Sequence, residues 1–343
     1  MSLKTTIEHR RLHFHKPAGT SRGMYKTHDV WYVRIFDGER YGIGECAPLP
    51  DLSCDAGPDY LSRLEQACKQ LEKTDLLDKE ALRNQPSILF GLETAMRQLD
   101  VLNQSVRHPF ALWDTPFSRS EQGIPINGLI WMGSYRDMEA QIHEKLDQGF
   151  TCIKLKIGAI QFEEEFALLK HIRAAYSPET VTLRVDANGA FAPKEALEKL
   201  KRLSELGLHS IEQPIRAGQW EVLQGLVQDS PLPIALDEEL IGIHSATEKT
   251  RLLDNLKPLY LVLKPTLHGG MYGCSEWICL AEERNIGWWM TSALESNIGL
   301  NAVSQWCATL DNPLHQGLGT GLLYTDNLPM PLVIEGEKLW FKP

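Results

Sequence analysis

Three features are missing from this sequence, and each absence narrows its function. No stretch approaches the roughly eighteen apolar residues of a membrane span, and the N-terminal residues MSLKTTIEHRRLHFH lack the apolar core of a signal peptide. No basic cluster offsets the formal charge of -10, which disfavours nucleic acid as a partner. The seven cysteines form no C-x-x-C pair, which indicates free thiols in a reducing compartment. We therefore expect a cytoplasmic protein with no membrane or nucleic-acid partner and a small-molecule ligand.

The chain has 343 residues, of which 43% are hydrophobic, so it can bury a large core in one big domain and a smaller one. Its N-terminal part predicts an antiparallel meander of three strands, followed by helices, with the strands near 5–15, 30–36 and 41–45. Between the first two strands, residues 16–27 contain Pro17, Gly19 and Gly23, a composition that favours a mobile flap over a hairpin turn. Residues 1–115 are thus predicted to form an α+β domain.

From about residue 125 the pattern changes to alternating strands and helices. The strand candidates are 125–130, 151–156, 181–186, 208–212, 233–237, 258–264, 286–291 and 314–318. Eight strands at this period predict a closed parallel barrel over residues 116–321. The tail, residues 322–343, shows no amphipathic helix and is expected to return to the first domain. No low-complexity linker separates the two units, so we expect the site in the cleft between them.

Charged residues end the predicted barrel strands at regular spacing. Successive intervals of 30, 26, 25 and 27 residues separate Lys156, Asp186, Glu212, Asp237 and Lys264. Each interval is about the length of one strand, one helix and two loops, so the charges should meet at the same end of consecutive parallel strands. Such a meeting of acids and lysines indicates an active site.

A second lysine shares the face of the first. Residues i and i+2 of a strand point the same way, so Lys154 and Lys156 point together, with Ile153 and Leu155 on the opposite side. In a barrel strand both lysines would face the lumen, whereas in an edge strand both would be solvated. Lysine is almost never fully buried without a partner, so inward lysines need anions nearby.

Three acids can supply those anions. Asp186, Glu212 and Asp237 each end an apolar run, and three uncompensated carboxylates at close range would raise one another's pKa. A hard divalent cation resolves this repulsion, and all-oxygen ligation favours Mg²⁺, with Mn²⁺ as a substitute, over zinc. A structural salt-bridge network with the lysines is the alternative. Glu238 and Glu239 follow directly, so spacing alone does not decide which acid of this run binds metal.

Lys264 ends the sixth barrel strand and would lie across the lumen from the lysine pair. Lysine can act as a base when desolvation and neighbouring positive charge lower its pKa. Opposed lysines beside a cation suit the removal of a proton next to a carboxylate, because a cation stabilises the negative charge that forms when the proton leaves. Further along, Ser292 and Glu295 lie where the seventh strand end would meet a substrate.

These residues together resemble the enolase superfamily, and within it the muconate lactonizing subgroup, which carries K-x-K on the second barrel strand and lysine on the sixth. The resemblance covers nearly the whole chain. It implies an α+β capping domain over a (β/α)₇β modified TIM barrel. It also implies Mg²⁺ ligands and flanking lysines, with Asp186, Glu212 and Asp237 as ligands and Lys156 and Lys264 beside the substrate.

Local runs resemble the o-succinylbenzoate synthase family more specifically, namely GIGECAPLP, SALESNIGL and GLGTGLLYTDN. The resemblance implies a hydro-lyase of menaquinone biosynthesis that dehydrates 2-succinyl-6-hydroxy-2,4-cyclohexadiene-1-carboxylate. Lys156 would remove and return the proton, Lys264 would stabilise the charge, and Lys154 would support Lys156. The implied substrate-binding residues are Arg184, Ser292, Glu295, Gly319 and Thr320.

Related families share the first half of this reaction. Dipeptide epimerases usually carry D-x-D at the eighth strand end, where this chain has GLGTG. N-acylamino acid racemases have no such excluding mark and stay open as an alternative. Mandelate racemase relatives need a His-Asp pair in place of Lys264. A non-catalytic barrel that only binds a ligand predicts the loss of at least one metal acid or lysine, and none is lost.

Overall fold

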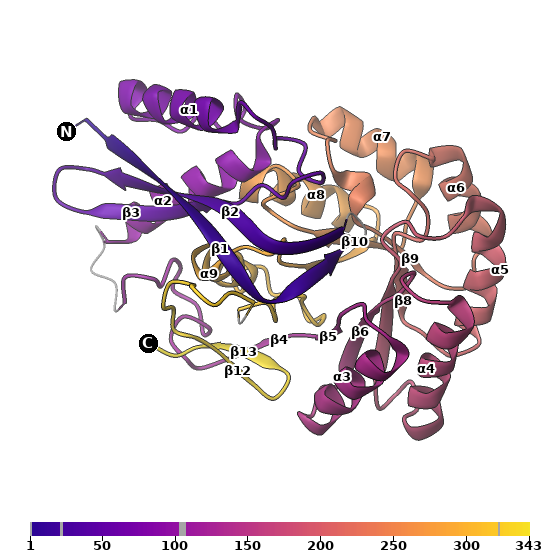
Figure 1. Cartoon of the computed structure of the whole chain (residues 1–343). Helices are drawn as coiled ribbons and strands as arrows, with labels where there is room; N and C mark the ends of the chain where they lie inside the picture. The colour runs from indigo at the N-terminus through magenta and orange to yellow at the C-terminus, as the bar shows by residue number, and fades with distance from the viewer. Residues whose placement is uncertain (1, 21–22, 103–107, 322) are drawn as a thin grey trace.

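A computed structural model describes residues 2–20, 23–102, 108–321 and 323–343. Its N-terminal unit is an antiparallel sheet of order β1-β2-β3 with the helices α1 and α2 packed against it (Figure 1). The bounds are β1 (Lys4–Thr20), β2 (Gly23–Phe36), β3 (Tyr41–Cys46), α1 (Tyr60–Thr74) and α2 (Pro86–Leu102). Gly44 permits the close packing of β3 on α2, because a Cβ at this position would lie 1.8 Å from the carbonyl oxygen of Gly91.

The predicted flap over residues 16–27 is wrong as far as the described residues go. Strands β1 and β2 continue pairing through it, with Ala18 opposite Tyr25 and Thr20 opposite Gly23. The register shifts between His13 and Ala18, so the bulged stretch absorbs Pro17, which has no N–H to donate to a ladder. Residues 21 and 22 at the tip lie outside the described residues.

The second unit is a parallel sheet that runs in order from β5 to β11. Its strands are β5 (Gly128–Ile130), β6 (Cys152–Lys156), β7 (Thr182–Asp186), β8 (Ser210–Glu212), β9 (Ile234–Leu236), β10 (Tyr260–Leu263) and β11 (Gly287–Met290). Gln316 pairs with Ile126, before β5, and Gly317 pairs with Thr291, after β11, both in parallel bridges. This eighth segment closes the sheet, so the predicted closed barrel is confirmed.

A helix follows each strand from β5 to β11, which gives the predicted (β/α)₇β order. These are α3 (Tyr135–Asp147), α4 (Phe162–Ala175), α5 (Pro193–Ser204), α6 (Trp220–Asp229), α7 (Ala246–Leu256), α8 (Gly270–Glu282) and α9 (Asn297–Cys307), with a 3₁₀ turn, η1 (Glu238–Leu240), after β9. Figure 1 shows α4 to α7 along the outer rim of the sheet. Helix α5 shows why the helices pack on the sheet, since Ala196, Leu200 and Leu203 form one buried apolar stripe that faces the barrel. No helix of the described residues is long and apolar enough to cross a membrane.

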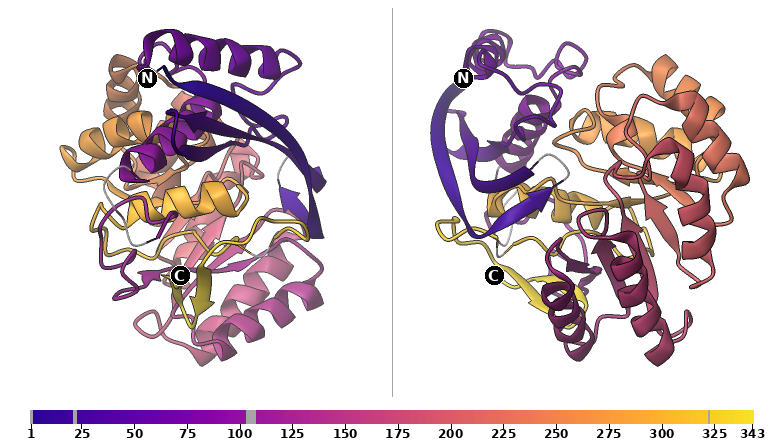
Figure 2. Two further views of the ribbon diagram at one scale, coloured as in Figure 1. Left: turned by 90° about the vertical axis from the view of Figure 1, so that its left-hand side faces the viewer. Right: turned by 45° about the vertical axis from the view of Figure 1, so that its right-hand side comes forward.

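The C-terminal tail touches both units. Tyr324 forms a bridge with Phe14 of β1, and the N–H of Thr325 donates to the carbonyl of His13, so this stretch reaches the N-terminal sheet. Further on, β12 (Leu332–Glu335) and β13 (Lys338–Phe341) pair with each other, and β13 pairs with β4 (Ile124–Pro125). Figure 2 shows the N-terminal hairpin arching beside the barrel. The domain boundaries given above stay a prediction.

Candidate active site

The charged residues meet in the barrel lumen because of the strand register. Lys156 of β6 lies opposite Asp186 of β7, and Asp186 lies opposite Glu212 of β8. Neighbouring strands lie about 4.8 Å apart, so this row brings three charges into direct reach. Because side chains alternate along a strand, Ile153 and Leu155 point to the other side, where both are fully buried in the hydrophobic core shared with the surrounding helices.

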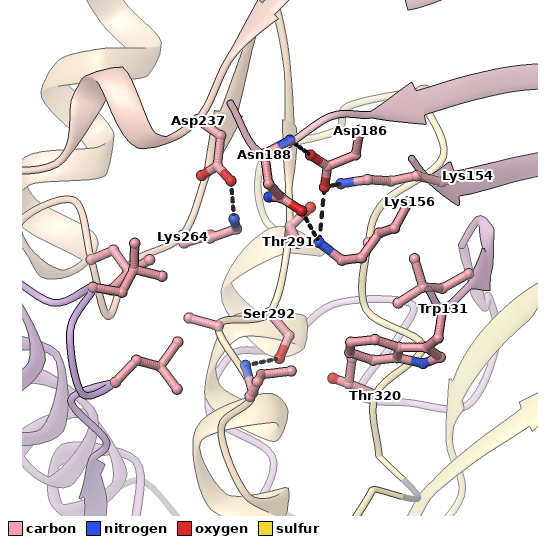
Figure 3. A pocket seen from close by; sticks show the side chains of 18 of the residues that line it. Trp131, Lys154, Lys156, Asp186, Asn188, Asp237, Lys264, Thr291, Ser292 and Thr320 are labelled. Carbon is pink, nitrogen blue, oxygen red and sulfur yellow. Dashed lines mark hydrogen bonds and ion pairs between the residues drawn. The ribbon is translucent and has the colours of Figure 1, made fainter. Parts of the chain in front are cut away.

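Each lysine of β6 is paired with acids (Figure 3). The Nζ of Lys154 forms ion pairs with Asp186 at 3.1 Å and with Glu212, and the residue is only 5% exposed. The Nζ of Lys156 donates to Asp186 Oδ2 at 3.0 Å and to Asn188 Oδ1 at 2.8 Å. The alternative of a solvated edge strand is thereby excluded, since β6 lies between β5 and β7 and both side chains point into the lumen toward carboxylates.

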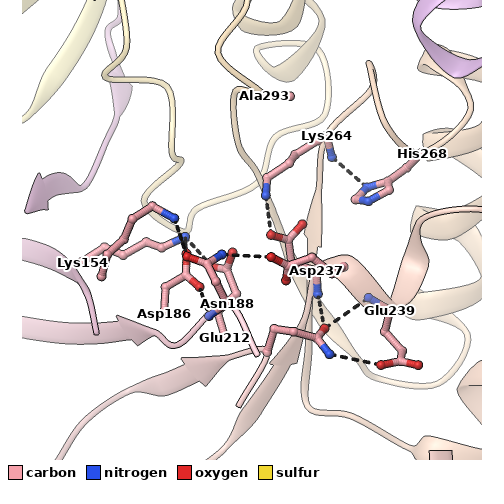
Figure 4. A network of polar contacts seen from close by, with 12 residues as sticks. Lys154, Asp186, Asn188, Glu212, Asp237, Glu239, Lys264, His268 and Ala293 are labelled. Carbon is pink, nitrogen blue, oxygen red and sulfur yellow. Dashed lines mark hydrogen bonds and ion pairs between the residues drawn. The ribbon is translucent and has the colours of Figure 1, made fainter. Parts of the chain in front are cut away.

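The opposite wall of the lumen carries Lys264, which follows β10 (Figure 4). Its Nζ forms an ion pair with Asp237, which follows β9. The backbone N–H of Lys264 donates to Nδ1 of His268 at 3.0 Å, so the buried imidazole fixes the start of this loop. Lysines therefore face the lumen from two sides, as the sequence predicts.

Paired charges shift the ionisation of this cluster in opposite directions. Burial alone would raise the pKa of Asp186, but the ammonium groups of Lys154 and Lys156 hold it well below its usual range. Burial would likewise lower the pKa of Lys264, yet the charge of Asp237 raises it well above its ordinary value. Burial and the charge of Asp186 raise the pKa of Glu212 to about 8. The cluster thus keeps Lys264 protonated and shifts the pKa of Glu212 close to neutral pH.

A cavity of about 90 Å³ lies over these groups. The predicted residues Ser292, Gly319 and Thr320 line it, together with three lysines, Asp186 and Asp237. Its other polar walls are Glu238, which the sequence leaves open as a metal ligand, Thr291 at the expected end of the seventh strand, and Asn127 and Asn188, which were not predicted. Leu49, Leu52, Trp131, Leu267 and Leu294 add apolar surface, so the cavity suits an apolar ring that carries a carboxylate.

A larger hollow of about 700 Å³ adjoins this cavity. Asn127, Trp131 and Thr320 line both spaces, so they form the wall between them. The outer hollow extends to Lys16 of the N-terminal hairpin and to Lys145 of α3. A ligand larger than the inner cavity therefore has room to extend outward past Trp131.

Arg184 does not line the cavity. It lies one row below Asp186 on β7, and its guanidinium stacks 4.1 Å from the centre of the Trp289 ring. Its Nη1 donates to the carbonyl of His315 at 2.8 Å. The side chain is therefore engaged at the floor of the lumen rather than at its mouth.

Glu295 also lies outside the cavity, and it is 1% exposed. Its carboxylate accepts hydrogen bonds from Thr266 Oγ1 at 2.6 Å, Ser292 Oγ at 2.7 Å and the N–H of Ala293 at 2.7 Å. Both oxygens are thus used to shape the loop after β11. Glu239 has a comparable place, since it accepts from the N–H of Gly218 and from Gln213.

The donors that could hold a metal are oxygens with unused capacity. Glu212 Oε1, Asp237 Oδ1 and Glu238 Oε2 are buried and accept no hydrogen bond. Within the described part of the chain, no three acids, histidines or cysteines already converge as a metal site, because lysines occupy the space between the carboxylates. Buried carboxylate oxygens without partners fit a hard cation such as Mg²⁺.

Asn188 is the missed residue that the sequence could have revealed. It follows Asp186 by two positions, accepts from Lys156, and donates from Nδ2 to Glu238 Oε1 at 3.0 Å. It thereby links the lysine pair to the acids after β9. Asn127 and Trp131, in contrast, flank a short strand with no charge pattern, so no signal in the sequence marks them.

Comparison with known proteins agrees with this geometry. Residues 137–340 match the family described as enolase C-terminal domain-like, and residues 20–99 match the one described as MenC, N-terminal domain. The chain is 44% identical to the o-succinylbenzoate synthase of Desulfotalea psychrophila over 95% of both chains. This chain belongs to the o-succinylbenzoate synthase family of the enolase superfamily.

Solved structures support the same family and fold. The crystal structure of MenC from Desulfotalea psychrophila has a TM-score of 0.85 and 39% identity, covering 99% of this chain and all of the other. Among sequence relatives, the L-Ala-D/L-Glu epimerase of Bacillus subtilis is 26% identical over 87% of this chain and 82% of its own. A dipeptide epimerase from Enterococcus faecalis shares only the fold, with a TM-score of 0.85, 18% identity and coverage of 100% and 98%. The epimerases are thus more distant relatives.

Proposed function

We propose that this chain is a Mg²⁺-dependent hydro-lyase that converts 2-succinyl-6-hydroxy-2,4-cyclohexadiene-1-carboxylate to 2-succinylbenzoate in menaquinone biosynthesis. One observation carries the proposal. Lys156 and Lys264 face one cavity from opposite walls, with Asp186 and Asp237 between them. This arrangement suits the removal of a proton next to a carboxylate, and the family of the chain supplies the substrate.

Lys156 is the proposed acid and base. Its Nζ uses two hydrogen-bond positions on Asp186 and Asn188, and the third position is left for the substrate. The amine takes the proton from the ring carbon next to the carboxylate. The C–O bond of the ring hydroxyl then breaks, and the same Nζ returns the proton to the departing oxygen, so one water leaves and the ring becomes aromatic.

Lys264 and Lys154 supply fixed positive charge. The raised pKa of Lys264 keeps its ammonium protonated, and it stabilises the negative charge that develops on the substrate carboxylate. Lys154 holds Asp186 and Glu212 in place beside Lys156. Asp186, Glu212 and Asp237 would hold Mg²⁺, which supplies further stabilisation of the developing charge. Neighbouring Glu238 is free to share in binding through its unpartnered oxygen.

The remaining walls would hold the substrate. Ser292, Gly319 and Thr320 line the cavity beside the lysines, whereas Arg184 and Glu295 support it from below and behind. The 317–321 loop, GLGTG, has no carboxylate to hold a substrate amine, which disfavours a dipeptide epimerase. The succinyl chain extends past Trp131 into the outer hollow. We also propose that the enzyme acts in the cytoplasm on this small carboxylate and has no nucleic-acid or membrane partner.

Turnover of the synthase substrate tests the proposal. With Mg²⁺ the chain should release 2-succinylbenzoate, and the activity should vanish on chelation and return when Mg²⁺ is restored. Lys156→Ala should abolish it. An N-acyl amino acid serves as the rival substrate. Fast racemisation of that compound with no dehydration would instead show an N-acylamino acid racemase.

A further inference from the structure

The loop after β11 has an unusual backbone at a cavity-lining residue. Leu294 has φ of +65°, in the left-handed region that a branched side chain rarely adopts. It lines the inner cavity together with Ser292 and Ala293. Such a conformation persists only where the surrounding structure holds it in place, and residues 291–296 are held by contacts from two sides.

Part of the restraint comes from the barrel itself. The Oγ of Ser292 accepts the N–H of Leu294 at 3.0 Å, the contact drawn beside Ser292 in Figure 3. Glu295 binds Ser292 and Ala293 and is tied to Thr266 of the preceding loop. These bonds fix the amide side of Leu294.

The capping domain holds the other side of the loop. Oε1 of Glu45, at the end of β3, accepts the N–H of Ser296 at 2.7 Å, and Oε2 accepts both Ser296 Oγ at 2.5 Å and the N–H of Gly299 at 2.7 Å. The hydroxyl of Tyr32 lies 2.9 Å from Ser296 Oγ. Glu45 is fully buried, so its carboxylate acts as a cap for the first turn of α9 supplied from another domain.

A second contact acts on Leu294 directly. Its carbonyl accepts the hydroxyl of Tyr324 at 2.5 Å and lies 3.2 Å from Nδ1 of His28, on β2. His28 is buried and also lies 2.9 Å from the Tyr324 hydroxyl. The carbonyl and the following helix start are thus both held by groups from outside the barrel.

We propose that Glu45, Tyr32 and His28 are positioning residues, through which the capping domain holds Leu294 in its left-handed conformation and so sets the wall of the active-site cavity. The domain contact and the shape of the cavity are then one coupled feature. The kinetic part of this inference rests on the proposed function, whereas the coupling itself is a property of the fold.

Glu93 provides a matched control. It also belongs to the capping domain, is buried, and accepts N–H groups at a barrel helix start, those of Met271 at 2.6 Å and Tyr272 at 3.1 Å on α8. Among the described residues its hydrogen bonds and ion pair go to Met271, Tyr272 and Lys79, none of which belongs to residues 291–296. Glu93→Gln therefore weakens the same kind of domain contact without touching the proposed clamp.

The test combines Glu45→Gln and Glu93→Gln with Leu294→Gly, which removes the backbone strain at that position. Glu45→Gln should raise KM about tenfold, the effect of losing a hydrogen bond to a charged group. In the Leu294→Gly background the same change should raise KM less than about threefold, because glycine adopts the conformation without a clamp. Glu93→Gln should leave KM unchanged in both backgrounds.

Denaturant unfolding gives a readout that needs no substrate. Glu45→Gln should lower the denaturation midpoint less in the parent chain than in the Leu294→Gly background. Only in the parent chain does relaxation of the loop release backbone strain at Leu294, and this release offsets part of the loss. Ser296→Ala, which removes the hydroxyl partner of Glu45, serves if Glu45→Gln fails to fold. Additive effects of Glu45→Gln and Leu294→Gly on the midpoint, or an equal rise in KM for Glu93→Gln, would overturn the proposal. A chain without dehydratase activity would contradict the proposed function alone.

Discussion

Two groups of buried acids in this molecule are compensated in different ways. At the barrel mouth, Asp186 and Asp237 face lysines, and those ammonium groups lower the pKa of both carboxyls although burial opposes the shift. At the contact between the domains, Glu45 and Glu93 face backbone N–H groups of helix starts, and burial raises the pKa of each to about 7. Lysine charges thus hold Asp186 and Asp237 ionised, whereas burial dominates at Glu45 and Glu93, as it also does at Glu212, whose pKa rises to about 8.

The acids at the barrel mouth therefore serve the reaction, whereas the acids between the domains serve the contact of the two units. Stabilisation of a developing anion needs charges that persist in a nearly dry site, and the facing carboxylates keep the lysines of the mouth charged. Joining two domains needs hydrogen-bond acceptors for the unpaired N–H groups of a helix start. A buried carboxyl group can accept these hydrogen bonds whether it is ionised or protonated, although the protonated form accepts them less well. Variants that remove one member of each group test this division.

The largest expected effect is at the mouth. Lys156→Ala removes the proposed acid and base and should lower kcat by about 10³-fold or more. Lys249→Ala is the control, since Lys249 is a more deeply buried lysine that pairs with Glu276 at 2.7 Å outside the cavity. Steady-state kinetics on folded protein should show kcat retained in the control. Comparable losses in both variants would mean that Lys156 serves the fold rather than the reaction.

Metal dependence gives the next test. Glu212→Gln removes a charged oxygen donor and should raise the Mg²⁺ concentration for half-maximal activity by about 100-fold. Glu239→Gln is the neighbouring control, because Glu239 binds Gln213 and the N–H of Gly218 instead of facing the cavity. A Mg²⁺ titration of both variants checks this. An unchanged requirement in Glu212→Gln would place the metal elsewhere.

The sequence predicted which charged residues meet at the mouth of the barrel, because strand spacing and side-chain alternation determine their positions. Period-2 alternation places Lys154 and Lys156 on one face, and the even spacing of the strand ends brings Asp186 and Glu212 beside them. Eight strand candidates at an even period likewise predicted the barrel. These features depend on local periodicity and on one repeated topology, both of which are legible in a single chain.

Features that depend on distant contacts were not predictable. Glu295 lies at the expected strand end, but its pairing with Thr266 turns it away from the cavity. Arg184 shares the inward face of Asp186, and only the third dimension shows that Trp289 engages it one row lower. The partners of Glu45 lie more than 250 positions away in the chain, so no local pattern marks them.

The interface acids should make stability depend on pH. Glu93 ionises in the unfolded chain near its ordinary pKa of 4.5 but in the folded chain only near 7, so its contribution to the free energy of unfolding falls as pH rises through this window. The charged group facing it is Lys79, at 3.5 Å. Between pH 5 and pH 8 the parent should lose about 2 kcal/mol relative to Glu93→Gln. Parallel pH profiles from denaturant unfolding would contradict this origin.

The smallest expected effect is at the lumen floor. Arg184→Met removes the stacking on Trp289 and the bond to the His315 carbonyl, and should lower the free energy of unfolding by about 1 kcal/mol. KM should stay unchanged, because Arg184 does not line the cavity. A rise in KM with unaltered stability would restore the substrate-binding role that the sequence predicts for it.

Proton removal by Lys156 is the step on which the account depends most. The direct measurement uses the synthase substrate deuterated at the ring carbon that bears the carboxylate, under single-turnover conditions with Mg²⁺. We predict a primary isotope effect on dehydration in the parent chain, and no loss of deuterium in Lys156→Ala. Dehydration at the parent rate in Lys156→Ala, with the deuterium still removed, would contradict the account.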